Sequence, residues 1–336
     1  MIDSSRQNKE RDNAVDNFRG FCVLLVIFFF FFETLDFLPQ FMAHSVDGGR
    51  LTPTDFIASG FMFALAFANV ISLERFKATG AYGAAVRKSV TRNFALIGIG
   101  FLMVTIQAVI DKEKTLTFNV LSAFGVAGLY SLFFIKCGRL GKLLSGIAII
   151  VAYQFVLFIP AALDYVLAND FGGFLGAAAW CGYMLIISFA ADVYRQKDFR
   201  KFTVTTVLCL GISVVFALCD IIAKAQGGAV YDFFIASKLL ASMSFLFISL
   251  GVCMTVFWLF VKFTGDKQIP VLNHYGCNSL LTFIFAAGIG RGFTTLAQNY
   301  VTSTNVGYII ALGCVASAVI CAGFSYLLSR FNISAI

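Results

Sequence analysis

Apolar residues form long uninterrupted runs along this chain, separated by short polar connections. A bilayer core of about 30 Å needs roughly 20 apolar residues at about 1.5 Å rise per residue, so runs of this length predict membrane-spanning helices. The runs do not alternate polar and apolar residues as the strands of a membrane barrel do. The pattern therefore predicts an all-α bundle of about 10 transmembrane helices, at residues 18–38, 54–74, 91–110, 118–136, 142–162, 173–192, 201–223, 237–262, 270–290 and 304–328.

The composition excludes most soluble classes of protein. The 336 residues are 59% hydrophobic and only 13% charged, whereas soluble domains carry about 25% charged residues. So apolar a chain is neither an ordinary soluble enzyme nor a disordered segment, because it would collapse or partition into lipid. We therefore expect a multi-pass integral membrane protein.

The Lys and Arg residues are distributed unequally between the two sides of the predicted bundle. Of the 25, 19 fall on one side and 6 on the other, and cytoplasmic loops carry the excess. Both termini are therefore predicted to be cytoplasmic, with an N-terminal segment at 1–17, a single transmembrane domain at 18–330 and a tail at 331–336. The same distribution explains the net charge of +7 without nucleic acid, whose binding sites gather basic residues on one soluble domain.

The nine Cys residues lie almost entirely inside apolar runs. Buried thiols of this kind behave as small hydrophobic side chains, and the chain contains no C-x-x-C pair. The pattern predicts neither disulfides nor a metal site. Together with the short connections, the lack of disulfide cysteines favours a bacterial inner (cytoplasmic) membrane.

A first polar cluster follows the first predicted helix on the outer side and extends into the second. It includes Glu33, Asp36, His44 and Asp55. His44 is the one group on this side that titrates near neutrality, as a general base does, although spacing alone favours a solvated loop histidine. Asp55 follows Thr52 at the predicted start of a helix, a pattern that by itself favours a capping role.

Two further clusters lie on the predicted cytoplasmic side. Asp16, Arg19 and Gly20 stand at the mouth of the first helix, and the segment PVLNHYGCNSLLTF at 270–283 enters the ninth. Polar residues at such positions can simply bond to neighbouring helices, and interfacial basic residues usually extend toward lipid phosphates. The same cations could bind a polyanion such as coenzyme A, because guanidinium groups bind phosphate through two hydrogen bonds. The basic residues considered are Arg19, Lys88, Arg92, Arg139 and Lys142.

The order of these motifs resembles the heparan-alpha-glucosaminide N-acetyltransferase family of transmembrane acyltransferases. Asp16, Arg19 and Gly20 match an Asp-x-x-Arg-Gly signature at the cytosolic end of a helix. A second motif of the family, a His followed by a Gly-containing loop and a Thr-x-x-Asp helix start, is matched by His44, Gly48 or Gly49, Thr52 and Asp55. The chain departs from the family pattern at Ser59, where a Pro is usual, at Ala286, where a His is, and at Glu33, which replaces an amide. Looser matches extend over most of the chain, at RNFALIGIGFLM, FNVLSAFGVAGLYSLFF, ANDFGGFLGAAAWCGYML and PVLNHYGCNSLLTF.

The resemblance implies an enzyme that moves an acyl group from cytosolic acetyl-CoA across the bilayer to a sugar hydroxyl or amine of an extracytoplasmic glycan or glycolipid. His44 would act as the base or carry the acyl group, and Glu33 or Asp55 would hold its ring. Besides acetyl-CoA, the expected partners are the acceptor glycan and membrane lipids, with no metal and no nucleic acid, and a homodimer is compatible with the sequence. The residues expected to hold CoA are Arg19, Arg92, Lys88 and Arg139, with Asn278 lining the site by resemblance.

Two other classes of function remain open from the sequence. A secondary transporter for a small polar solute could use Glu33, Asp36 and Lys238 as a proton or substrate relay. Such transporters often contain inverted repeats with broken helices in both halves, and the sequence shows no such pairing. A structural or lipid-scaffolding protein without chemistry is the third alternative.

Overall fold

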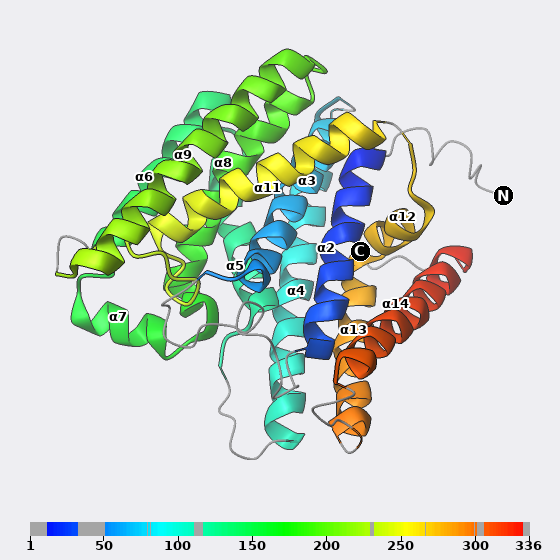
Figure 1. The fold of residues 1–336 in the computed structure, drawn as a ribbon. Coiled ribbons are helices and arrows are strands. Elements are labelled where there is room, and N and C mark those ends of the chain that lie inside the picture. The colour runs from blue at the N-terminus through cyan, green and yellow to red at the C-terminus, as the bar shows by residue number, and fades with distance from the viewer. Residues whose placement is uncertain are drawn as a thin grey trace. The chain divides into compact units, whose positions relative to one another are not determined.

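A computed structural model describes residues 12–32, 51–78, 80, 82–110, 117–228, 232–265, 267–298, 300 and 306–331. Within these ranges the chain forms twelve α-helices joined by short turns and 3-10 segments (Figure 1). The all-α prediction is confirmed. The helices are α2 (Asn13–Phe32), α3 (Phe56–Ala78), α4 (Tyr82–Ile110), α5 (Val120–Ser131), α6 (Arg139–Val156), α7 (Pro160–Leu167), α8 (Gly173–Tyr194), α9 (Phe199–Gln226), α11 (Met243–Thr264), α12 (Pro270–Cys277), α13 (Ser279–Gln298) and α14 (Val306–Arg330).

The described residues contain eight helices that are long and apolar enough to cross a membrane. Two shorter apolar helices, Val120–Phe134 and Ser279–Gly290, accompany them. Only helices and closed barrels satisfy all their backbone hydrogen bonds in lipid, so repeated apolar helices of this length indicate a multi-pass membrane protein.

Three predicted spans are interrupted, or become helical late, in the structure. The span at 270–290 is divided into α12 and α13 at Asn278, whose φ of −120° and ψ of 35° are not helical. The span at 142–162 ends at Val156, and Pro160 begins the separate helix α7 because the residue before a proline is driven to an extended conformation. The span at 237–262 becomes helical only at Met243, since the Ser242 hydroxyl accepts hydrogen bonds from the backbone at Ser237 (2.9 Å) and Phe245 (3.4 Å).

The chain divides into two compact units. Unit 1 comprises residues 1–45, 52–61 and 256–336, and unit 2 comprises 46–51 and 62–255. The predicted boundaries of one transmembrane domain at 18 and 330 stay a prediction.

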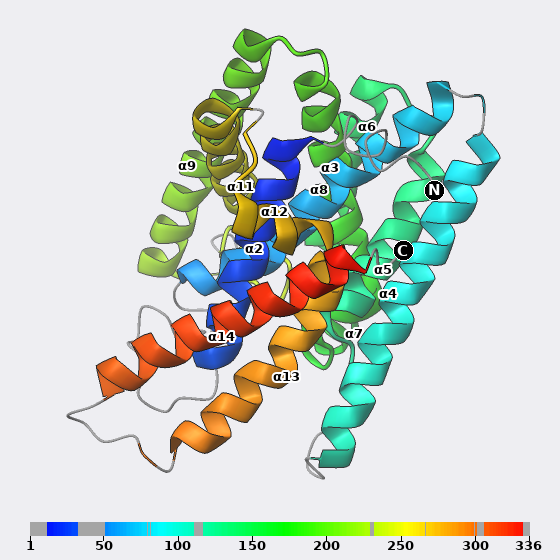
Figure 2. The same cartoon turned by 90° about the vertical axis from the view of Figure 1, so that its right-hand side faces the viewer.

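In unit 1, helix α2 packs against α12, α13 and α14 (Figure 2). Its apolar core consists of Val23, Ile27, Tyr275, Ala286 and Cys321, each at most 1% exposed. Ala286 is thus enclosed by apolar side chains at the position where the family pattern has a histidine. These five residues therefore serve to pack the helices of unit 1 together.

In unit 2, the helices α4, α5, α6 and α8 form the most closely packed group, with α9 beside α8 (Figure 1). A Cβ atom added to Gly146 of α6 would lie 2.7 Å from the carbonyl oxygen of Gly182 on α8, and the reverse is also true. Backbones that approach this closely through small residues are typical of helix contacts in membranes.

Asn119 joins α5 to α4. Its side-chain oxygen accepts a hydrogen bond from the backbone of Ser122 (3.0 Å), and its amide nitrogen donates to the carbonyl of Gly100 (2.9 Å). Asn119 therefore serves to bond two neighbouring helices.

Candidate functional site

Two motifs that are distant in the sequence meet where α2 crosses α12 in unit 1. A Cβ atom on Gly20 would collide with the backbone carbonyl of Leu272, and one on Gly276 would collide with the carbonyl of Asp16. The two helices therefore touch backbone to backbone at two points. Both glycines are required by this close approach, which is a structural reason for their presence in the motifs.

Arg19 extends from this contact toward the start of α13. One terminal nitrogen of its guanidinium donates to the Ser279 hydroxyl (2.9 Å), and the other lies 3.5 Å from a carboxylate oxygen of Asp16. The Arg19 side chain remains 28% exposed. Asn278, which precedes Ser279 at the helix break, is 5% exposed. The bond to Ser279 therefore places Arg19 beside the residue that follows Asn278, and the donor-binding roles of Arg19 and Asn278 stay predictions.

Asn17 was not singled out in the sequence, yet it holds the segment that leads into α12. The residue is fully buried. Its amide nitrogen donates to the carbonyl of Lys267 (2.9 Å), and its oxygen accepts from the backbone of Ile269 (3.2 Å). Its position between the two motif residues Asp16 and Arg19 was the available signal in the sequence.

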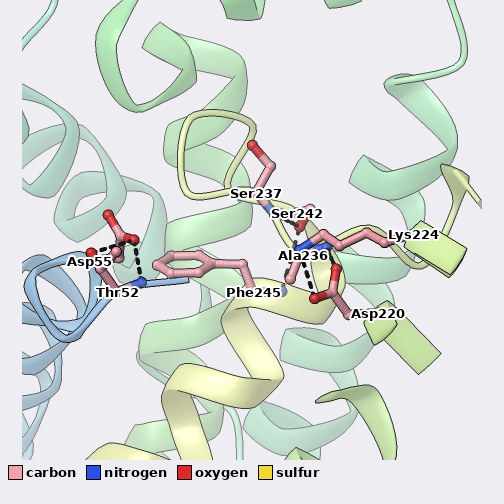
Figure 3. A network of polar contacts seen from close by, with 8 residues as sticks. All are labelled: Thr52, Asp55, Asp220, Lys224, Ala236, Ser237, Ser242 and Phe245. Atoms are coloured by element: carbon pink, nitrogen blue, oxygen red, sulfur yellow. Dashed lines mark hydrogen bonds and ion pairs between the residues drawn. The ribbon is translucent and has the colours of Figure 1, made fainter. Parts of the chain in front are cut away.

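Asp55 caps the start of the helical segment that continues as α3. One oxygen of its carboxylate accepts hydrogen bonds from the Thr52 backbone N–H (2.9 Å) and hydroxyl (3.0 Å) (Figure 3). Asp55 is 5% exposed. The capping interpretation is therefore confirmed. A carboxylate accepts several hydrogen bonds, so capping is compatible with orienting an imidazole. His44 and Glu33 lie outside the described residues, and their roles stay predictions.

Unit 2 contains a basic pocket of about 80 Å³ between α3, α4, α6, α8 and the end of α5. Lys88 and Arg92, one turn apart on α4, line this pocket together with Lys142 of α6. The lining contains three cations and, among the described residues, no carboxylate. We refer to it as the basic pocket. Its polar lining residues are Asn69, Ser72, Lys88, Ser89, Arg92, Ser131, Lys142 and Ser188.

The basic pocket has the chemistry of an anion site. Guanidinium and ammonium groups bind phosphate through charge-assisted hydrogen bonds, and a concave site of one sign of charge concentrates the opposite sign. The hydroxyls of Ser131 and Ser188 already donate to carbonyl oxygens of their own helices at 2.7 Å. The cations therefore provide the main attraction for an anion.

The predicted donor-binding residues are distributed over both units. Lys88 and Arg92 share the basic pocket, whereas Arg19 and Asn278 belong to unit 1. Arg139, the first residue of α6, is exposed and does not line the basic pocket. The serines and Asn69 were missed in the sequence, because a single hydroxyl inside an apolar run is most often bonded to its own helix.

A second polar network in unit 2 holds the turn before α11. Asp220 of α9 accepts hydrogen bonds from Lys224 (2.8 Å) and from the backbone of Ala236 (2.7 Å) (Figure 3). Gln154 bonds both ends of the turn, at the Phe233 carbonyl (3.0 Å) and the Met243 N–H (2.8 Å). These contacts position a connection, and we assign them no chemistry.

Lys238, the proposed relay residue of the transporter alternative, lies in this turn with its ammonium 5.8 Å from the centre of the Phe171 ring. Its proposed partners Glu33 and Asp36 lie outside the described residues. The relay therefore stays a prediction.

Comparison with known families gives one match. Residues 11–207, more than half of the chain, match the family model described as heparan-alpha-glucosaminide N-acetyltransferase, catalytic. No curated protein is significantly similar to the chain. The matched region includes the start of α2, the segment around His44 and all three cations of the basic pocket. Asn278 lies beyond it.

Proposed function

Because this chain belongs to the heparan-alpha-glucosaminide N-acetyltransferase family, we propose that it transfers an acetyl group from cytosolic acetyl-CoA to an extracytoplasmic glycan. The acceptor group is a sugar hydroxyl or amine. Family membership makes the chain a membrane acetyltransferase and counts against the transporter and scaffold alternatives. The identity of the acceptor and the direction of transfer belong to the proposal.

The basic pocket is the observation that carries the proposal. Coenzyme A is a polyanion, and Lys88, Arg92 and Lys142 supply the charge that its phosphates need. In unit 1, Arg19, whose guanidinium donates to Ser279, and Asn278 stay the residues that the family resemblance predicts for CoA binding. Arg139 is a weaker contributor, since it is exposed at the start of α6.

The proposed topology places the basic pocket on the cytoplasmic side. About ten spans, counting the two shorter apolar helices with the eight longer ones, would bring both termini to the side with more Lys and Arg. The transmembrane domain would extend over 18–330 in a bacterial inner membrane. Acetyl-CoA, made in the cytosol, would then meet the cations first.

The chemistry requires positioning and one base, because a thioester is already activated. His44 accepts the proton of the acceptor while the acceptor oxygen or nitrogen attacks the thioester carbonyl carbon. The carbon–sulfur bond breaks, and the CoA thiolate takes the proton from the imidazolium. Alternatively, the His44 imidazole carries the acetyl group between donor and acceptor. Glu33 or Asp55 stabilises the imidazolium.

The test measures acetyl transfer from labelled acetyl-CoA in membranes that contain the full chain. We expect acetyl label on a glycan and a KM for acetyl-CoA raised by about tenfold or more in a Lys88→Gln/Arg92→Gln variant, because two charge-assisted contacts are lost. Arg200→Gln is the matched control, since Arg200 is an exposed cation that does not line the basic pocket. Solute uptake without CoA turnover would support transport, and an unchanged KM would remove the basic pocket from donor binding.

A further inference from the structure

Lys142 differs from the other two cations of the basic pocket. Lys88 is exposed and Arg92 is partly exposed, whereas the Lys142 side chain is only 8% exposed. Its ammonium lies 3.1 Å from a carboxylate oxygen of Asp192, whose side chain is also 8% exposed. Within the described part of the chain, Asp192 is the one carboxylate at ion-pair distance from Lys142.

The arrangement of this ion pair is asymmetric with respect to the basic pocket. Lys142 lines the pocket, and Asp192 does not. Asp192 stands one turn beyond Ser188 on α8, so it pairs with Lys142 without itself belonging to the lining. A ligand in the pocket would therefore meet Lys142, which lines it, and not Asp192. An ammonium has three N–H donors, and one hydrogen bond, to Asp192, is made here.

The ion pair is not the sole contact between α6 and α8. The two helices already meet at Gly146 and Gly182, where each glycine faces the backbone of the other. A buried ion pair is also weak evidence for stability, since apolar residues of similar volume often replace one without loss. The packing of α6 against α8 therefore does not by itself explain why a charged pair, Lys142 and Asp192, stands beside the pocket.

We propose that Asp192 is the resident counterion of the basic pocket, and that it neutralises Lys142 until a phosphate group of acetyl-CoA takes over that charge. Asp192 is thus a positioning residue that weakens donor binding. Its negative charge repels the incoming phosphate. When the CoA product leaves, Asp192 again forms its ion pair with Lys142. The inference rests on the proposed function, because it assumes that the pocket receives a phosphate group.

Electrostatics determines whether the loss of the Asp192 charge strengthens or weakens CoA binding. A unit charge a few ångströms from a phosphate, at the effective dielectric constant of a protein surface, changes the interaction by an amount equivalent to at least about tenfold in affinity. Replacing Asp192 by the isosteric asparagine removes a repulsive charge. A purely structural ion pair makes the opposite prediction, since the loss of Asp192 would loosen Lys142 and weaken binding.

The experiment measures CoA binding to the purified full chain in detergent by calorimetry, together with KM and product inhibition by CoA. In Asp192→Asn we expect CoA to bind about tenfold more tightly, the KM for acetyl-CoA to fall and product inhibition to strengthen. Asp198→Asn is the matched control, because Asp198 pairs with Lys201 away from the pocket lining and asparagine also caps helices well. Its CoA affinity should equal that of the unmodified chain.

Unchanged or weaker CoA binding by folded Asp192→Asn protein would overturn the inference. Because this variant leaves a buried cation without its partner, Lys142→Met/Asp192→Leu is measured alongside it as a variant with no buried charge. We expect this double variant to bind CoA several-fold less tightly than the unmodified chain. If its affinity is unchanged, Lys142 does not reach the phosphate and the inference fails.

The Lys88→Gln/Arg92→Gln variant tests the proposed function independently of the inference about Asp192. If that variant binds CoA as tightly as the unmodified chain, the basic pocket is not the donor site and the proposed function loses its support. If that variant binds more weakly while Asp192→Asn does not bind more tightly, the donor site stands and only the counterion role of Asp192 is wrong.

Discussion

In unit 1 Arg19 is bonded to Ser279 and Asp16 beside a glycine-mediated helix contact, whereas the basic pocket of unit 2 has three cations and, among the residues that the structure describes, no carboxylate in its lining. The first region uses polar residues to hold two helices at close range. The second gathers cations around a pocket, where one of them, Lys142, is paired with Asp192. The most recognisable motif, around Asp16 and Gly20, is thus partly architectural, and the less recognisable cations of α4 and α6 are better placed for binding.

The largest expected effect is on the rate of acetyl transfer, and it comes from His44, which is not among the residues described for the glycine-mediated helix contact or for the basic pocket. His44→Ala should lower kcat by about 10² to 10⁴, because a positioned base contributes that much to rate. Insertion, yield and CoA affinity should remain those of the unmodified chain, and radiolabel transfer with parallel CoA calorimetry checks this. A variant with unmodified turnover would exclude His44 as the base or acyl carrier.

The next effect tests the architectural region. Gly20→Ala should lower the free energy of unfolding by about 1–3 kcal/mol or more, because its Cβ would collide with the Leu272 backbone. The midpoint of thermal unfolding in detergent is the measurement. Gly288→Ala is the control on α13, where an added Cβ meets no atom within 4 Å. Equal midpoints for the two variants would contradict the close contact of α2 and α12.

A smaller loss of stability is expected from the cap at the start of α3. Thr52→Ala removes the hydroxyl that donates to Asp55 at 3.0 Å but retains the backbone bond. The cost should be about 1 kcal/mol, seen as a lower unfolding midpoint with an unchanged KM for acetyl-CoA. Thr105→Ala, which removes an exposed hydroxyl bonded to its own helix, should change neither quantity. A raised KM in Thr52→Ala alone would link the cap to donor binding.

The smallest effect concerns the basic pocket. Raising the ionic strength from 0.05 to 0.5 M should increase the KM for acetyl-CoA by a few-fold, because added salt screens the attraction between the cations and the phosphates. The unfolding midpoint should change little. In Lys88→Gln/Arg92→Gln the salt dependence should be flatter, and a dependence as steep as that of the unmodified chain would place the responsible charges elsewhere.

The sequence by itself determined the class of the protein and the positions of its helices. Each of the ten predicted spans overlaps an observed helix, because long apolar runs leave the backbone no other way to satisfy its hydrogen bonds in lipid. The local cap at Asp55 was also readable, since Thr52 lies three residues away. The division of one predicted span at Asn278 was not, because an apolar window shows hydrophobic length and does not show where the backbone turns.

Only the tertiary structure decided which polar residues meet. Arg19 and Ser279 are 260 residues apart in the sequence, and Lys142 and Asp192 are 50 apart. No local periodicity records such pairs, because each depends on how whole helices pack through glycines such as Gly20 and Gly146. The sequence could therefore identify Lys88 and Arg92 as candidate phosphate ligands, while the pocket that joins them to Lys142, and the carboxylate behind it, required the packed helices.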